Sequence, residues 1–263
     1  MTKPEFHVPL SPMMVAPRII GTALLGLTLM TFGACRGHGR KLAQDVPILL
    51  FNGAGISPND VAALETILKD KGLSYSTVNS SRLNAMDEDD LRGHRLLIVP
   101  GGNFEEMGNQ LTANTATNIR NAVQGGMNYL GVCAGAFIAG NSPYNGLNLT
   151  SGVRFAFYSA ENQGVRKTAV SIADAGGSTL DQYWEDGPQL SGWGEVIAKY
   201  PDGTPAVVQR NVGNGWVILS GIHPEAPENW RRGMSFSTPA DVDNAYAARL
   251  ILAALHRTSL PHY

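Results

Sequence analysis

The sequence has little cysteine and little net charge, and each shortage excludes a class of protein. Only two of its 263 residues are cysteines, Cys35 and Cys133, so a small fold held together by several disulfides is excluded. The formal net charge is -2 at pH 7, which gives no reason to expect a nucleic acid as a partner. No cluster of cysteines and histidines has the spacing of a zinc site, so we expect neither a metal nor a cofactor.

Internal repeats and low-complexity tracts are lacking as well. Apolar residues make up 43% of the chain and charged residues 16%, a balance that suits a packed globular core rather than a disordered chain. The length is enough for one large domain or for two small ones.

Charge is also missing from residues 19–34, an apolar run with several Gly and Thr residues that follows Lys3 and Arg18. The run is shorter than the ~20 residues of a membrane-spanning helix and is typical of the hydrophobic region of a secretory signal. It ends in small residues before Cys35, which resembles the lipobox of bacterial lipoproteins. That resemblance implies a signal peptide over residues 1–35. It also implies that a lipid on Cys35 anchors an exported domain to a membrane of the cell envelope, on its periplasmic face.

Two other interpretations of this segment stay open. One is an uncleaved membrane anchor, and the other is an ordinary signal peptide cleaved near Ala34. All three interpretations export the domain that follows. Residues 36–45 are polar and basic, and we interpret them as a tether that leads to that domain.

The rest of the chain, residues 46–263, alternates between apolar runs and helical patterns. Continuous apolar runs are typical of strands buried on both faces of a parallel sheet. We expect strands over 46–51, 73–78, 95–99 and 127–132, with helices over 58–72, 112–123 and 134–139. Beyond Gly146 the pattern predicts short strands over 196–199, 206–209 and 216–219, joined by Asp-Gly and Asn-Gly turns, and a final helix over 239–256.

This alternation predicts one α/β domain over residues 46–263. Its architecture is expected to be three-layer and flavodoxin-like, with a mostly parallel central sheet. In such folds the functional site lies at the carboxyl ends of the strands. Residues at those ends are therefore the candidates for chemistry.

The sharpest motif is Gly131-Val132-Cys133-Ala134-Gly135, where a predicted strand runs directly into a helix. Glycines two before and two after a cysteine are typical of a nucleophile elbow, whose sharp turn exposes the nucleophile above the sheet. The helix start behind Cys133 favours a negatively charged sulfur. The amide of Ala134 is placed to stabilise an oxyanion. The alternative interpretation is that Cys133 is a small buried residue in a tight packing turn.

A second motif, His223-Pro224-Glu225, follows the strand predicted over 216–219. A cysteine nucleophile needs a base, and the base needs an orienting partner. If the segment is extended, residues two apart point the same way, so Glu225 can orient His223. His223 and Cys133 then lie at the ends of two strands.

The two motifs together resemble the class I glutamine amidotransferases. The resemblance implies that Cys133 is the nucleophile, His223 the base and Glu225 the residue that orients it. Pro100-Gly101-Gly102 resembles the family's glycine-rich oxyanion loop, which implies a second oxyanion amide at Gly102, although Gly101 is equally placed.

A closer resemblance is to the amidotransferase-like domain at the N-terminus of biotin–protein ligases, which also occurs as stand-alone bacterial proteins. The aromatic, glycine-bearing tract 181–188, DQYWEDGP, is similar to a motif of that family, and the resemblance covers residues 46–255. No biotin-ligase catalytic module is recognised in the chain, so we do not expect it to ligate biotin.

The expected function is that of a cysteine-dependent hydrolase, similar to an amidase, that acts on an amide or a related carbonyl compound. Phe137 stands where the family commonly has glutamine or an aliphatic residue, which argues against ordinary glutamine binding. The alternative is a non-catalytic module at the cell envelope that binds a small molecule or a peptide. A third interpretation is a redox or electrophile sensor that uses Cys133 alone.

Overall fold

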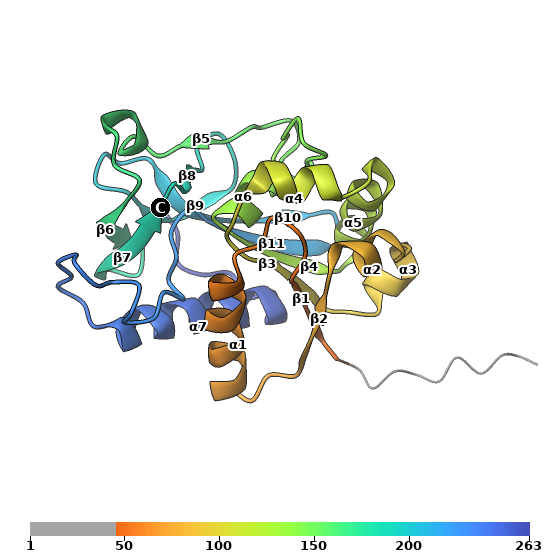
Figure 1. The fold of residues 1–263 in the computed structure, drawn as a ribbon, viewed down its shortest axis with the longest axis horizontal. Coiled ribbons are helices and arrows are strands. Elements are labelled where there is room, and N and C mark those ends of the chain that lie inside the picture. Colours follow the sequence, from red (N-terminus) through yellow and green to blue (C-terminus); the bar gives the residue numbers. More distant parts are fainter. Residues whose placement is uncertain (1–45) are drawn as a thin grey trace, which may run out of the picture. The chain divides into compact units, whose positions relative to one another are not determined.

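The computed structural model describes residues 46–263, and a large mixed sheet runs through them (Figure 1). Its strands are β1 (Ile48–Phe51), β2 (Tyr75–Val78), β3 (Leu96–Val99), β4 (Asn128–Val132), β6 (Lys167–Asp174), β7 (Thr179–Glu185), β9 (Glu195–Lys199), β10 (Pro205–Val212) and β11 (Gly215–Ser220). They lie in the order β2-β1-β3-β4-β11-β10-β9-β6-β7. A separate pair joins β5 (Ala156–Phe157) to β8 (Pro188–Gln189).

The large sheet has two halves. Strands β2, β1, β3, β4 and β11 pair in parallel, and we call them the parallel half. Strands β10, β9, β6 and β7 pair antiparallel, beginning with β10 against β11, and we call them the antiparallel half. Every residue of β1, β3 and β4 is buried, as expected for strands covered on both faces. The predicted α/β class is confirmed, and its parallel character belongs to the first half.

Helices cover both faces of the sheet, with α1 and α7 on one side and α4, α5 and α6 on the other (Figure 1). The helices are α1 (Pro58–Asp70), α2 (Ser80–Asn84), α3 (Glu88–Arg92), α4 (Phe104–Gln110), α5 (Ala113–Gly125), α6 (Ala134–Ala139) and α7 (Ala240–His256). Helices α1 to α5 each begin after a residue whose side chain accepts a hydrogen bond from a first-turn amide; these caps are Ser57, Asn79, Asp87, Asn103 and Thr112.

The expected elements of residues 46–263 all occur, with ends shifted by a few residues. The acidic run 87–90, expected from the sequence as a helix start, does begin α3. The β6–β7 hairpin and the short helices α2 and α4 were not expected. No helix within residues 46–263 is long and apolar enough to cross a membrane. The signal peptide, the tether and the lipid on Cys35 fall on residues 1–45, outside the described residues, and remain predictions.

Candidate active site

Cys133 lies at the corner between β4 and α6. Its backbone has φ 50° and ψ −104°, a conformation that costs a non-glycine residue about 1–3 kcal/mol. The two flanking glycines, Gly131 and Gly135, cannot be replaced by larger residues without a clash with backbone. A Cβ at Gly131 would lie 2.5 Å from Gly135 O, and one at Gly135 would lie 2.0 Å from Val99 O. Packing thus holds the cysteine in the strained turn of a nucleophile elbow.

His223 follows β11 and is held by backbone on two sides. Its amide donates to Tyr183 O at 2.8 Å, which bridges the loop to β7. Its Nδ1 lies 2.9 Å from Glu225 Oε1. An extended segment was expected here from the sequence, but the structure has a turn, closed by a bond from Ala226 N to His223 O at 3.2 Å. The contact between His223 and Glu225 is therefore present, although the reason given for it from the sequence was wrong.

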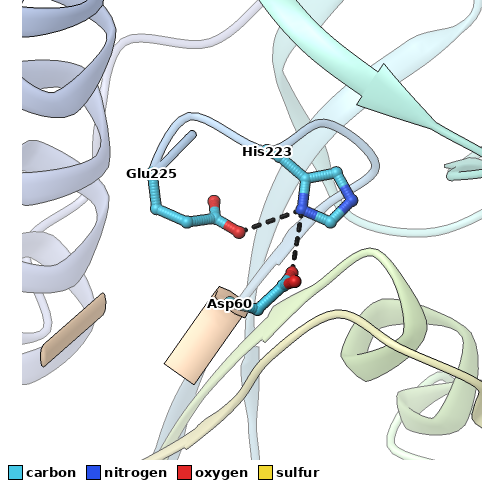
Figure 2. A group of neighbouring side chains, drawn as sticks. All are labelled: Asp60, His223 and Glu225. Carbon is cyan, nitrogen blue, oxygen red and sulfur yellow. Dashed lines mark hydrogen bonds and ion pairs between the residues drawn. The ribbon is translucent and has the colours of Figure 1, made fainter. Parts of the chain in front are cut away.

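A second carboxylate, Asp60, faces the same ring nitrogen. Figure 2 shows Glu225 and Asp60 converging on His223 Nδ1, and Asp60 Oδ1 lies 3.1 Å from it. Asp60 sits in the first turn of α1, where its own amide donates to Ser57 Oγ at 3.4 Å. From the sequence, Asp60 is only part of a helix start. The signal for its role is its place just after β1, at the carboxyl edge of the parallel half.

Burial and charge act against each other in this cluster. Burial lowers the pKa of His223, but the charges of Cys133 and the two carboxylates together raise it by more. The pKa of His223 therefore lies well above its ordinary value. Burial also raises the pKa of Glu225, and the contact with His223 does not cancel that effect. For Asp60, burial raises the pKa, but the contact with His223 outweighs it and lowers the pKa overall. Asp60 therefore retains its negative charge more readily than Glu225 does.

Asp60, His223 and Glu225 could also be considered as metal ligands. Within the described residues, they form the group of acidic and histidine side chains whose ligand atoms lie close enough together to share a metal ion. One ligand atom from each lies within 4.8 Å of the others. We interpret the group as hydrogen-bonded, because His223 Nδ1 and Glu225 Oε1 lie at hydrogen-bond distance and a proton between them satisfies both.

The thiol of Cys133 and the ring of His223 line one cavity of about 600 Å³. In the structure the thiol donates to Glu185 O at 3.5 Å, and no hydrogen bond joins Cys133 to His223 within residues 46–263. The strands thus bring the predicted nucleophile and base to one cavity without joining them directly.

Both predicted oxyanion donors also line this cavity. Gly102 forms an isolated β-bridge with Ile56, whose hydrogen bonds run from Ser57 N to Gly101 O and from Asn103 N to Gly55 O. The amide of Gly102 itself therefore has no hydrogen-bond partner among the described residues. Its φ is 145°, and a Cβ there would lie 2.1 Å from Gly55 O, so only glycine fits. The amide of Ala134 is the first of α6 and has no acceptor within its own helix.

Three phenylalanines form one wall of the cavity, which we call the aromatic shelf: Phe104, Phe137 and Phe157. The ring of Phe137 stacks on Phe104 with centroids 4.6 Å apart and lies 4.9 Å from Phe157. The shelf also lines a second cavity of about 410 Å³, so the two cavities adjoin along it. Phe137 thus gives the cavity that holds Cys133 an apolar wall.

Comparison with known proteins finds a matching family model. Residues 46–145 match the family model described as "Biotin-protein ligase, N terminal". The chain resembles the N-terminal domain of biotin–protein ligases. The matched stretch covers less than half of the chain; it holds Asp60, Gly102 and Cys133 and ends before His223. The predicted resemblance to this N-terminal domain is confirmed over residues 46–145. None of the curated proteins compared with the chain matches it.

Solved structures share the fold. A glutamine amidotransferase is 22% identical, with 66% of this chain and 90% of that one aligned at a TM-score of 0.49. A candidate GMP synthase component from Thermoplasma acidophilum is 12% identical, with 81% and 96% aligned at 0.50. The GH42 β-galactosidase Gan42B is 12% identical, with 79% of this chain aligned at 0.50, but the chain spans only 30% of its length. The two structures aligned at a TM-score of 0.50 have identities so low that they show the fold alone.

Proposed function

We propose that this chain is an exported, cysteine-dependent amidase that acts on an amide or a related carbonyl compound. One observation supports this most: Cys133, in a strained elbow, lines the same cavity as His223, whose Nδ1 is bonded to Glu225. A nucleophile beside a base that has its own orienting carboxylate is the arrangement that nucleophilic catalysis requires.

In the proposed reaction, Cys133 Sγ passes its proton to His223 Nε2 and attacks the carbonyl carbon, forming a C–S bond. The carbonyl oxygen becomes an oxyanion, which the amides of Gly102 and Ala134 stabilise. His223 then gives the proton to the leaving nitrogen as the C–N bond breaks, and an acyl-thioester remains. Water next gives a proton to His223 and attacks the thioester, and the acid leaves as the thiol regains the proton.

The orientation of the imidazole supports this sequence of steps. Because Nδ1 faces the two carboxylates, Nε2 is the nitrogen left for the thiol and the substrate (Figure 2). The thiol must first leave its acceptor, the carbonyl of Glu185. That change is a rotation of one side chain in a cavity large enough to allow it.

The aromatic shelf bears on the substrate. A substrate amide at Cys133 would lie against the ring of Phe137, which is 7% exposed and stacked on Phe104. Polar side chains such as that of glutamine gain little from such a wall, whereas an apolar or aromatic group buries surface against it. We therefore propose a substrate with an apolar group next to the reacting amide, rather than free glutamine.

The place of action is also a proposal. Its support is the charge-free run over residues 19–34 and the lipobox-like sequence before Cys35. On this proposal a lipid holds the domain at a membrane of the cell envelope, where it meets small molecules or peptides. Mass spectrometry of the mature N-terminus tests it: a lipidated Cys35 supports it, and an intact Met1 contradicts it.

The first experiment measures the reactivity of Cys133. The purified chain is alkylated with iodoacetamide from pH 5 to 10, and mass spectrometry of the Cys133 peptide separates this thiol from Cys35. We expect alkylation to persist well below pH ~8.5, where an ordinary thiol loses reactivity, and to fall at least ~10-fold at pH 6 in His223→Ala. His256→Ala, an exposed histidine at the end of α7, is the matched control. A slow rate that His223→Ala leaves unchanged would sink the amidase proposal.

A second candidate function is a non-catalytic binding module. The hydrogen bond from the Cys133 thiol to the Glu185 carbonyl favours it, because a thiol held there is turned to the wall of the cavity. This alternative predicts that Cys133→Ala retains ligand affinity and biological function. The amidase proposal predicts that the same variant binds substrate but no longer cleaves it.

A further inference from the structure

Two carboxylates, rather than one, face the imidazole of His223 on its Nδ1 side. Glu225 Oε1 lies 2.9 Å from Nδ1 and Asp60 Oδ1 lies 3.1 Å from it. The side chain of Asp60 is 7% exposed, and that of Glu225 is fully buried. The mechanism proposed above gives a task to Glu225 alone, so a buried acid at the same nitrogen calls for its own explanation.

The contact of Asp60 with His223 depends on a glycine in a third loop. A Cβ at Gly101 would lie 2.3 Å from Asp60 Oδ1 and 2.6 Å from His223 Cε1. The loops after β1, β3 and β11 therefore pack together at this point, and any larger residue at Gly101 would push the acid and the ring apart. Such close packing leaves water little access between them.

A single proton on Nδ1 cannot fully satisfy both acids. A neutral imidazole donates one hydrogen bond from this nitrogen, and only the contact with Glu225 has hydrogen-bond geometry. The contact of Asp60 Oδ1 with Nδ1 falls outside hydrogen-bond geometry, so its interaction with the ring is mainly one of charge. A buried anion at 3.1 Å gains most when the imidazole is protonated.

Two anions side by side in a buried site also repel each other, so one of them tends to hold a proton. Burial raises the pKa of Glu225, whereas His223 outweighs burial and lowers that of Asp60. The other titratable groups that face the His223 ring are the Cys133 thiol and the ring of Tyr183, whose hydroxyl is bonded to Glu185. Asp60 is thus the acid best placed to carry the negative charge.

We propose that Asp60 is a second positioning residue, which stabilises the imidazolium that forms when His223 takes the proton of Cys133, while Glu225 fixes the ring by a hydrogen bond. The inference rests on the proposed function, because it concerns the same thiol and base. It divides between two acids the tasks that a triad gives to one. Asp60 supplies the charge and Glu225 supplies the direction.

The test is the pH profile of Cys133 alkylation by iodoacetamide in the full chain, with Asp60→Asn and Asp60→Ser as the variants. Asparagine keeps the shape of Asp60 and removes its charge. Serine removes the charge with a smaller side chain and serves as the second variant should asparagine impair folding. We expect the profile to move up by about one pH unit, so that the rate at pH 6 falls ~10-fold while the plateau above pH 9 stays. Asp70→Asn, an exposed acid at the other end of α1, is the matched control.

The outcomes separate this inference from the function on which it rests. If the Asp60 variants follow the wild-type profile while His223→Ala loses reactivity at pH 6, the inference is overturned and the amidase proposal stands. A fall of equal size at every pH, plateau included, also overturns it, because that is the mark of a purely structural role. If His223→Ala follows the wild-type profile too, both proposals fail together.

Discussion

The two halves of the sheet reach the cavity in different ways. The parallel half supplies the groups of the proposed mechanism, each from the segment that follows a strand: Asp60 from the start of α1 after β1, Gly102 after β3, Cys133 after β4 and His223 after β11. The antiparallel half lines part of the cavity and holds two of these residues in place by hydrogen bonds. Tyr183 and Glu185 on β7 offer backbone carbonyls to His223 and Cys133.

The family match follows the same division. It covers residues 46–145, which hold the first four strands of the parallel half and no strand of the antiparallel half. The strands that place Cys133 are thus what this chain has in common with the family model. Phe104 and Phe137 of the aromatic shelf lie within the match, whereas the rest of the cavity wall, including Phe157 and Glu185, comes from later residues. We expect the determinants of the substrate among those later residues. The predictions below test this contrast between the two halves of the sheet.

The largest effect should come from the reacting groups of the parallel half. His223→Gln is expected to lower the rate of amide cleavage ~100-fold or more, since the base of such a triad contributes orders of magnitude. Tyr183→Phe, in the antiparallel half, should lower it less than ~5-fold, because the backbone carbonyl that holds His223 remains. Steady-state kinetics of both variants provide the check, and equal losses would contradict the contrast.

Substitutions of glycines next to the two halves of the sheet should differ in how much they lower the free energy of unfolding. In Gly135→Ala the new methyl would lie 2.0 Å from Val99 O, so we expect a loss of about 3 kcal/mol or more from overpacking against backbone. Gly203 lies in an antiparallel turn with φ 84° and no atom within 4 Å of a new Cβ. Gly203→Ala should therefore cost only ~1–2 kcal/mol, from the left-handed backbone alone. Urea unfolding measures both, and a smaller loss for Gly135→Ala would contradict the packing argument.

The aromatic shelf should control selectivity rather than basal reactivity. Phe157→Ala removes one ring of the shelf, whose aromatic contacts are worth about 0.5–1.5 kcal/mol. We expect Cys133 to lose ~3–10-fold of its preference for N-benzyl chloroacetamide over N-methyl chloroacetamide, with the rate for the smaller reagent unchanged. Tyr263→Ala, another exposed aromatic, is the control. An unchanged ratio would remove the shelf from the binding site.

The smallest effect is a pH dependence of stability that comes from His223. Its pKa in the folded chain lies well above the ordinary 6.5, so above pH 6.5 the folded state binds more protons than the unfolded state. The free energy of unfolding should therefore fall as the pH rises from 6.5 through the folded-state pKa, by at most ~1.4 kcal/mol per pH unit for this one proton. His223→Gln should flatten that slope. A variant curve parallel to the wild type would show that other groups cause it.

Local patterns carried most of the prediction. The elbow spans five consecutive residues, so its spacing alone indicates it. The His223–Glu225 pair was found from its closeness in sequence, but a turn rather than an extended segment brings the two side chains together. Asp60 could not be found in this way, because it stands in the first turn of a helix, where an acid is common for reasons of capping and dipole. Its contact with His223 exists only once β1 and β11 lie in one sheet.

The antiparallel half was the hardest to predict. In β6 the buried positions are Val170, Ile172 and Asp174, with the exposed Ser171 and Ala173 between them, so no long apolar run marks the strand. Asp174 itself is buried because Arg249 of α7 pairs with it at 2.5 Å. Partners distant in sequence decide such a position, and the pattern of a single strand does not contain them.

The hydrogen bond from His223 N to Tyr183 O makes a distant turn part of the geometry of the base. Tyr183 pairs with Ala169 in the β6–β7 hairpin, and the tight turn around Gly177 sets that register. One residue added to this turn would slide β7 by a step, turn Tyr183 to the opposite face and present a different carbonyl to the histidine loop. The length of the hairpin therefore sets the position of the loop that carries His223, so an insertion at the hairpin tip should change the geometry of the cavity.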